Sequence, residues 1–216
     1  MLSAWEQHLS GHYPDPKKWM HGFKNISEQE FRRFANLWLS EGIPFAFQAQ
    51  PMIYEKAREL LLTKLDCINE GHLGVTGSAQ LGFSLSPHKF AREFIIGISD
   101  LDAWLISPKW FALLEKDIKN AEDEKFGIAK KPELSGNIER GFIDHKKIPG
   151  NEESAFPNAY KMSIVIINFQ HNLEAMCKGK RFKEVSLRVY KDKSAKLRQQ
   201  TINLINAYSY AKSEKP

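Results

Sequence analysis

The chain has 216 residues with a hydrophobic content of 42% and a charged content of 26%, the composition of a globular protein long enough to bury a core. No apolar run approaches the roughly 20 residues of a membrane-spanning helix, and the N-terminus lacks a signal-peptide pattern, so no membrane partner is expected. Only Cys67 and Cys177 are present, without metal-ligand spacing, which favours a cytoplasmic location.

Residues 1–50 are predicted to form an arm and a helix that pack on the rest of the chain. Residues 1–26 mix aromatic residues with prolines and histidines, which indicates an irregular arm. Ser27-Glu-Gln-Glu30 is a capping box, and the apolar residues after it recur at helical spacing until Gly42. The core is predicted over 51–216, and its first residue is a proline that opens a second helix.

Residues that bear chemistry first appear at the ends of two apolar runs. The first run, 73–76, ends in Gly77-Ser78, and the second, 94–106, is interrupted by Asp100-Leu101-Asp102. The second run predicts a strand, whose alternating side chains place both aspartates on one face, about 7 Å apart. Two such carboxylates repel each other unless a cation lies between them, and hard divalent ions prefer these oxygen ligands.

The Gly-Ser pair fits the chemistry of a phosphate. Gly77 allows the backbone to approach a ligand closely, and Ser78 offers a hydroxyl and an N–H group near the start of a predicted short helix. Either motif alone also fits a structural turn or an exposed strand end. Because apolar residues flank the carboxylates on both sides, where unpaired charges are costly to bury, the two motifs together favour metal-assisted phosphoryl or nucleotidyl transfer.

The middle of the chain is predicted to be mostly helical. Ser107-Pro108 begins a helix. Residues 127–158 are rich in Gly, Pro, Lys and Asn and are expected to be mobile, apart from a short strand around 142–144. Residues 162–169 fit a strand by their β-branched side chains and a helix by their continuation, and helix is favoured.

The C-terminal part carries a strand and a basic segment. Residues 183–190 alternate, with Glu184, Ser186, Arg188 and Tyr190 on the polar face. Ser194 is expected to cap a final helix. Residues 178–198 carry nine Lys or Arg and two acidic residues, a net charge of +7, which suits either a phosphate-binding surface or a solvated basic face.

The two motifs resemble the nucleotidyltransferase superfamily that includes DNA polymerase beta. Its pattern is an apolar residue, Gly-Ser, a spacer and then Asp-apolar-Asp on the next strand, which Gly77-Ser78 and Asp100-Leu101-Asp102 match. The spacer is longer than is usual in the family, with 21 residues between Ser78 and Asp100, and the excess is the polar loop 84–93. With Pro51-Met-Ile-Tyr-Glu upstream, the chain resembles a little-characterised bacterial branch. Some relatives in that broad group make nucleotide signals or short oligonucleotides in anti-phage defence.

The resemblance implies an α+β fold, in which a small mixed β-sheet carries the Gly-Ser and Asp-x-Asp motifs and helices flank it. It implies that Asp100 and Asp102 are catalytic metal ligands. A third carboxylate on a neighbouring strand would bind the metal and accept the proton of the attacking hydroxyl. Asp144 is preferred for this role over Glu184, although each also fits a surface acid.

The resemblance also implies how the triphosphate is held. Gly77 and Ser78 would contact the phosphates at the turn. Lys89 and Arg92, in the long loop, would hold the triphosphate tail as pyrophosphate leaves. Arg188, on the polar strand face, would reach a base or a phosphate.

These expectations describe a nucleotidyltransferase that uses Mg²⁺ or Mn²⁺ to move a nucleoside monophosphate from a triphosphate such as ATP to a hydroxyl. The expected partners are the nucleoside triphosphate, a single-stranded oligonucleotide as product or acceptor, and an effector protein. Three alternatives stay open. The protein could act as a toxin or antitoxin that modifies RNA or protein, as an inactive nucleotide-binding regulator, or as a basic nucleic-acid-binding protein in which the motif is accidental.

Overall fold

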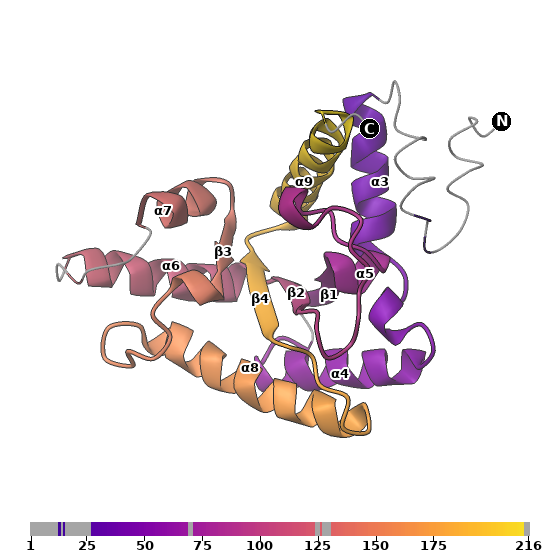
Figure 1. The fold of residues 1–216 in the computed structure, drawn as a ribbon. Helices are drawn as coiled ribbons and strands as arrows, with labels where there is room; N and C mark the ends of the chain where they lie inside the picture. Colours follow the sequence, from indigo (N-terminus) through magenta and orange to yellow (C-terminus); the bar gives the residue numbers. More distant parts are fainter. Residues whose placement is uncertain are drawn as a thin grey trace.

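The computed structural model describes residues 13, 15, 27–68, 71–123, 126 and 131–213, which form a mixed α+β fold around one small sheet (Figure 1). The strands are β1 (His72–Thr76), β2 (Leu101–Ile106), β3 (Phe142–Asp144) and β4 (Val185–Tyr190). The α-helices are α3 (Glu28–Ser40), α4 (Pro51–Lys64), α5 (Ser78–Leu81), α6 (Pro108–Asp123), α7 (Lys131–Glu139), α8 (Pro157–Met176) and α9 (Lys193–Ser213). Short 3-10 helices are η1 (Phe45–Phe47), η2 (Pro87–Lys89) and η3 (His145–Lys147).

The sheet has the strand order β1-β2-β4-β3. β1 pairs antiparallel with β2, β2 pairs parallel with β4, and β3 pairs antiparallel with β4. The predicted small mixed sheet with flanking helices is therefore present. Because side chains alternate along each strand, the register gives the sheet one apolar face and one face with polar and aromatic side chains.

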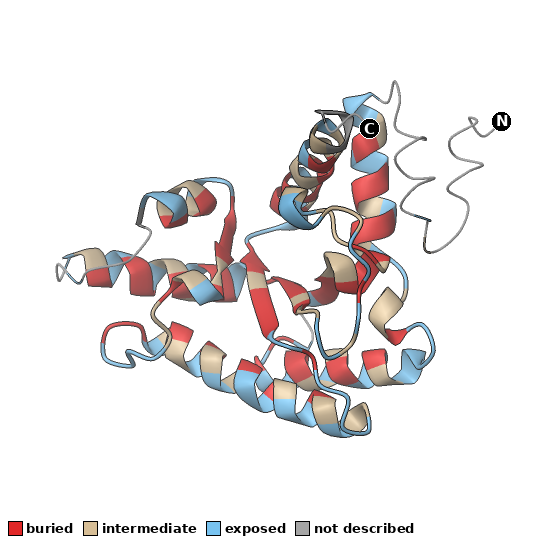
Figure 2. Ribbon diagram, in the orientation of Figure 1, coloured by how far each residue is buried: buried red, intermediate tan, exposed pale blue. Residues whose placement is uncertain are grey.

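The apolar face of the sheet packs against α4, α6 and α8. Its strand residues are Leu73, Val75, Leu101, Ala103, Leu105, Ile143, Val185, Leu187 and Val189. In the view of Figure 1, α4 and α8 lie below the sheet, and Figure 2 shows that the strands are largely buried. This burial removes the core from water and leaves the opposite face free to carry a site.

A second apolar cluster joins α3 to α9. Phe31, Phe34 and Trp38 of α3 pack with Leu204 and Ala207 of α9. The capping box of Ser27 and Glu30 is present as predicted: Glu30 N donates to Ser27 Oγ, and Ser27 N donates to Glu30 Oε2 at 2.8 Å. In the described part of the chain, no helix is both long and apolar enough to cross a bilayer.

The ambiguous segment 162–169 is helical, as favoured. It lies inside α8, where Met162, Ile166, Phe169 and Leu173 recur every three or four residues and are buried. Burial on one helix face has outweighed the strand propensity of the β-branched run.

Three local predictions were wrong. The predicted strand 94–106 is shorter, because 95–99 forms a turn and β2 begins at Leu101. Much of the region expected to be mobile is ordered, with α7 and η3 on either side of the correctly predicted β3. Asp192, not Ser194, caps α9, since Asp192 Oδ1 accepts a hydrogen bond from Ala195 N at 2.7 Å.

The predicted arm over 1–26 lies outside the described residues, except for Tyr13 and Asp15. The Tyr13 hydroxyl donates to the Ile43 carbonyl at 2.8 Å, and its ring meets Phe45 edge-on.

Candidate active site

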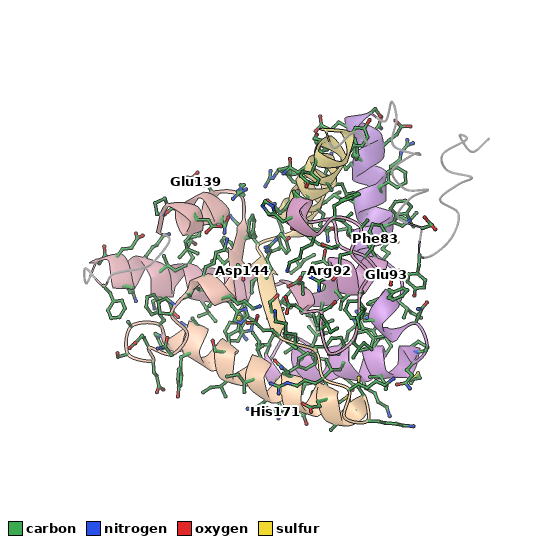
Figure 3. The ribbon with its side chains drawn as sticks, in the orientation of Figure 1. Phe83, Arg92, Glu93, Glu139, Asp144 and His171 are labelled. Atoms are coloured by element: carbon green, nitrogen blue, oxygen red, sulfur yellow. The ribbon has the colours of Figure 1, made fainter. Side chains whose placement is uncertain are left out.

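The polar face of the sheet forms the floor of a cleft of about 800 Å³. Its sides come from the loop 84–93 and from α9, and Figure 3 labels Arg92 and Asp144, which reach this region from that loop and from β3. Every site residue predicted from the sequence lines this cleft: Gly77, Ser78, Lys89, Arg92, Asp100, Asp102, Asp144 and Arg188. The fold thus brings together residues that are spread over more than 100 positions of sequence.

Gly77 forms the turn between β1 and α5. Its φ is +68° and its ψ is −149°, a conformation that is essentially restricted to glycine. A Cβ atom at this position would lie 3.3 Å from Asp102 Oδ2. Both the backbone conformation and the close approach of the aspartate therefore require glycine here, and Ser78 follows as the first residue of α5.

Asp102 is oriented by the strands on both sides of it. It lies opposite Thr76 of β1 and Ser186 of β4. The Ser186 hydroxyl donates to Asp102 Oδ1 at 2.6 Å, which leaves Oδ2 facing Gly77. Ser186 was not predicted as a site residue, although its position on the polar face with Arg188 was a signal.

Asp100 precedes β2 and lines the same cleft. Its Oδ1 is buried and accepts no hydrogen bond from any residue that the structure describes. A buried carboxylate oxygen without a partner is costly, and a bound cation would satisfy it.

Asp144 is held by an ion pair. It lies opposite Arg188 in the β3–β4 pairing, and Arg188 Nη2 lies 3.3 Å from Asp144 Oδ2. Burial alone lowers the pKa of Arg188, but the attraction of Tyr190 and Asp144 outweighs it, so the pKa lies above its ordinary value. The Nε atom of Arg188 is buried and donates to no described group, and the guanidinium carbon lies 5.0 Å from the centre of the Phe142 ring.

The competing acid, Glu184, is exposed and does not line the cleft. Its Oε2 lies 2.8 Å from Nζ of Lys146. Of the two candidates for a third carboxylate, only Asp144 faces the cleft.

Two carboxylates rather than three are available to bind a metal ion in the cleft. In the ranges that the structure describes, no three His, Cys, Asp or Glu side chains converge as a metal site. Asp100 and Asp102 nevertheless fit a magnesium-type ion, which in proteins commonly takes one or two carboxylates and fills its shell with substrate phosphates and water. The orphan oxygen of Asp100 is the observation that supports this fit.

The loop 84–93 is closed by backbone hydrogen bonds like a hairpin. Ser84 N donates to Arg92 O, Ala91 N donates to Ser84 O, and Phe94 N donates to Gly82 O. The loop presents Lys89 and Arg92 as exposed cations on the cleft.

His145 supports β4 from the side and was not singled out by the sequence. Burial lowers its pKa, so the ring is neutral near pH 7. Its Nδ1 lies 3.1 Å from Leu187 N, which donates to it. Leu187 lies between Ser186 and Arg188, so this contact holds the part of β4 that carries both site residues.

α9 contributes two further cleft residues that sequence analysis missed, Asn203 and Asn206. Their spacing of three residues, which places them on one helix face, was the only signal in the sequence.

Comparisons of the chain with protein-family models, curated proteins and solved structures found no match.

Proposed function

We propose that the protein is a metal-dependent nucleotidyltransferase that moves a nucleoside monophosphate from a triphosphate to a hydroxyl. The observation that carries the proposal is the unpartnered, buried oxygen of Asp100 in a cleft where Asp102 faces the Gly77 turn. The cleft brings together two carboxylates that would hold a divalent ion and a Gly-Ser turn and exposed cations that would hold phosphates.

Each residue has a distinct task in the proposed reaction. Asp100 and Asp102 hold the metal, and Ser186 keeps the Asp102 carboxylate in one orientation. When bound, Mg²⁺ or Mn²⁺ supplies Lewis-acid stabilisation of charge on the phosphate oxygens. Ser78 and the backbone at Gly77 bind the triphosphate close to these aspartates.

For its atoms and protons, the proposed transfer step needs only the two substrates and side chains of this protein. The acceptor oxygen bonds to the α-phosphorus, the bond from that phosphorus to the bridging oxygen breaks, and pyrophosphate leaves. Asp144, positioned by its ion pair with Arg188, accepts the proton of the acceptor hydroxyl. Lys89 and Arg92 stabilise the charge that develops on the departing pyrophosphate.

The favoured product is a short oligonucleotide or nucleotide signal made without a template, and the proposed biological setting is anti-phage defence beside an effector. The resemblance to the superfamily and the net charge of +7 over 178–198 support this choice. Transfer to RNA or to a protein is the alternative for the acceptor.

Two observations favour a second candidate function. The Asp144 carboxylate is engaged by Arg188, and the described residues hold no cluster of three metal-ligating side chains. These features suit a regulator that binds a nucleotide without turning it over. Nucleotide binding without transfer would distinguish this candidate.

The test is incubation with labelled ribo- and deoxynucleoside triphosphates and Mg²⁺, with the products resolved by chromatography. Wild-type protein should form labelled product, and Asp100→Asn or Asp102→Asn should abolish it. Asp66→Asn is the matched control, because Asp66 is exposed and pairs with Lys109 at 2.8 Å outside the cleft.

Metal binding gives a readout that does not need turnover. Titration with Mn²⁺, followed by electron paramagnetic resonance of the free ion, should show a site that both cleft variants lose and the control keeps. Equal Mn²⁺ binding by wild type and the Asp100→Asn variant, together with no labelled product, would reject the proposal.

A further inference from the structure

The turn 95–99 and the segment 180–184 lie side by side where they lead into β2 and β4. Lys183 N donates to Ser99 O at 3.2 Å, and Leu101 N donates to Glu184 O at 2.8 Å. The buried rings of Phe94 and Phe182 lie 6.3 Å apart beneath them. Figure 1 shows the two segments running together beside the start of β4. They extend the parallel β2–β4 pairing into an irregular ridge, here called the rim.

The rim combines exposed apolar side chains with cations. Ile95 and Ile98 are 49% and 54% exposed, although large aliphatic residues are usually buried. Three exposed cations, here called the rim cluster, lie on the neighbouring segment: Lys180, Arg181 and Lys183. Ile98 and Lys183 also line the cleft together with Asp100, so the rim leads directly to the proposed metal ligands.

The basic segment 178–198 is divided by the fold into separate surfaces. The rim cluster precedes β4, whereas a distal cluster of Lys191, Lys193 and Arg198 follows it. The distal cluster lies beside β3, because Lys191 N donates to Gly141 O and Arg198 Nη2 donates to Arg140 O. Since β4 separates them, the two clusters lie roughly 20 Å or more apart along the strand. None of the distal cluster lines the cleft.

We propose that the rim binds the end of a single-stranded nucleic acid and presents its terminal hydroxyl beside Asp100. This inference rests on the proposed function and names its acceptor. Charge complementarity argues for this occupant: three exposed cations suit successive phosphates, and the exposed isoleucines offer apolar contact to unstacked bases. A duplex would hide its base faces from Ile95 and Ile98, so the single strand is the form that uses both features.

The test measures binding of a short single-stranded oligonucleotide, labelled at its 5′ end, by fluorescence anisotropy in EDTA at several salt concentrations. The rim variant replaces all three rim cations with Gln, and the control variant replaces the three distal cations with Gln. Both variants lose the same charge and alter only exposed side chains. A difference between them therefore reports position rather than net charge.

The rim variant should bind about tenfold or more weakly, and its log–log salt slope should be smaller by about 2, since each phosphate contact on a single strand contributes about 0.7. The control variant should bind within about twofold of wild type. Replacing Ile95 and Ile98 with Ser should weaken binding without changing the salt slope. Equal loss in the rim and control variants, or no binding by wild type, would overturn the inference.

The binding assay separates this inference from the proposed function. Binding in EDTA needs neither metal nor transfer. Rim-dependent binding without nucleotidyl transfer would reject the proposed transferase function but support the rim as a strand-binding surface. Transfer to a protein or small molecule, without strand binding, would reject the strand-binding role of the rim but support the transferase function.

Discussion

Replacing Gly77 with Ala tests the geometry of the site without any assumption about its chemistry. The backbone at Gly77 has φ +68° and ψ −149°, and a residue with a side chain held in such a region costs about 1–3 kcal/mol. The added Cβ would also lie 3.3 Å from Asp102 Oδ2, tighter than most contacts of a Cβ atom. Alanine also lowers the conformational entropy of the unfolded chain, which stabilises the folded state by less than about 1 kcal/mol. The expected net destabilisation is therefore about 2 kcal/mol.

Two other glycines separate the contributions. Gly179 has φ +80° with nothing within 4 Å of an added Cβ, so Ala there tests backbone strain alone. Gly136 lies in α7, also in open space, and Ala there should stabilise the protein by about 0.5–1 kcal/mol.

The assay is urea unfolding at pH 7, with the free energy of unfolding compared among the three variants. Gly77→Ala should lose the most stability, Gly179→Ala less, and Gly136→Ala none. In a thermal scan, a loss of 2 kcal/mol corresponds to about 4–8 °C for a protein of this size. If the unfolding free energy of Gly77→Ala lies within about 0.5 kcal/mol of wild type, the turn does not have a glycine-dependent backbone, and the site does not depend on glycine.

Three further predictions concern ligands and pH. Gly77→Val should abolish triphosphate binding, measured by calorimetry, with the helix content by circular dichroism unchanged; unaltered affinity would contradict the placement of the phosphates at this turn. Asp100→Ala should abolish transfer but not lower stability in the absence of metal, because removing one carboxylate relieves repulsion between the two. Asp102→Ala should also abolish transfer, but it removes the acceptor of the buried Ser186 hydroxyl and should lower stability by about 1–3 kcal/mol. Added Mn²⁺ should raise the melting temperature of wild type only, and an equal rise in the variants would place the metal elsewhere. Burial lowers the pKa of Lys196 to about 7, against about 10.4 in the unfolded chain. The unfolded state then holds more protons between pH 7 and 10, so wild-type stability should rise over this range relative to Lys196→Met, as measured by urea midpoints. A constant difference would show that this amine titrates normally, for example because the Trp104 ring 3.6 Å away favours its charged form.

Local features of the fold and of the site could be predicted from the sequence because each depends on residues close together in the chain. The capping box at Ser27, the glycine turn and the alternation from Val185 to Tyr190 are all set by backbone preferences and side-chain periodicity over a few positions. The same periodicity places Asp102 on the non-core face of its strand. It did not locate the start of that strand, because the apolar residues 94–98 resemble a strand while Gly97, with φ +95°, turns the chain there.

Only the tertiary structure decided which residues meet across the sheet. The Ser186 hydroxyl bonds to Asp102 across 84 positions of sequence, and Arg188 pairs with Asp144 across 44. Periodicity states which face of a strand a side chain occupies, but not which strand lies beside it or in what register, since register is set by the packing of the whole apolar face. The pairing places Asp144 opposite Arg188 in the cleft, whereas Glu184 precedes β4 and pairs with Lys146 outside the cleft. The separation of one basic segment into a rim cluster and a distal cluster has the same cause: β4 runs between them, and the sheet fixes what lies at each of its ends.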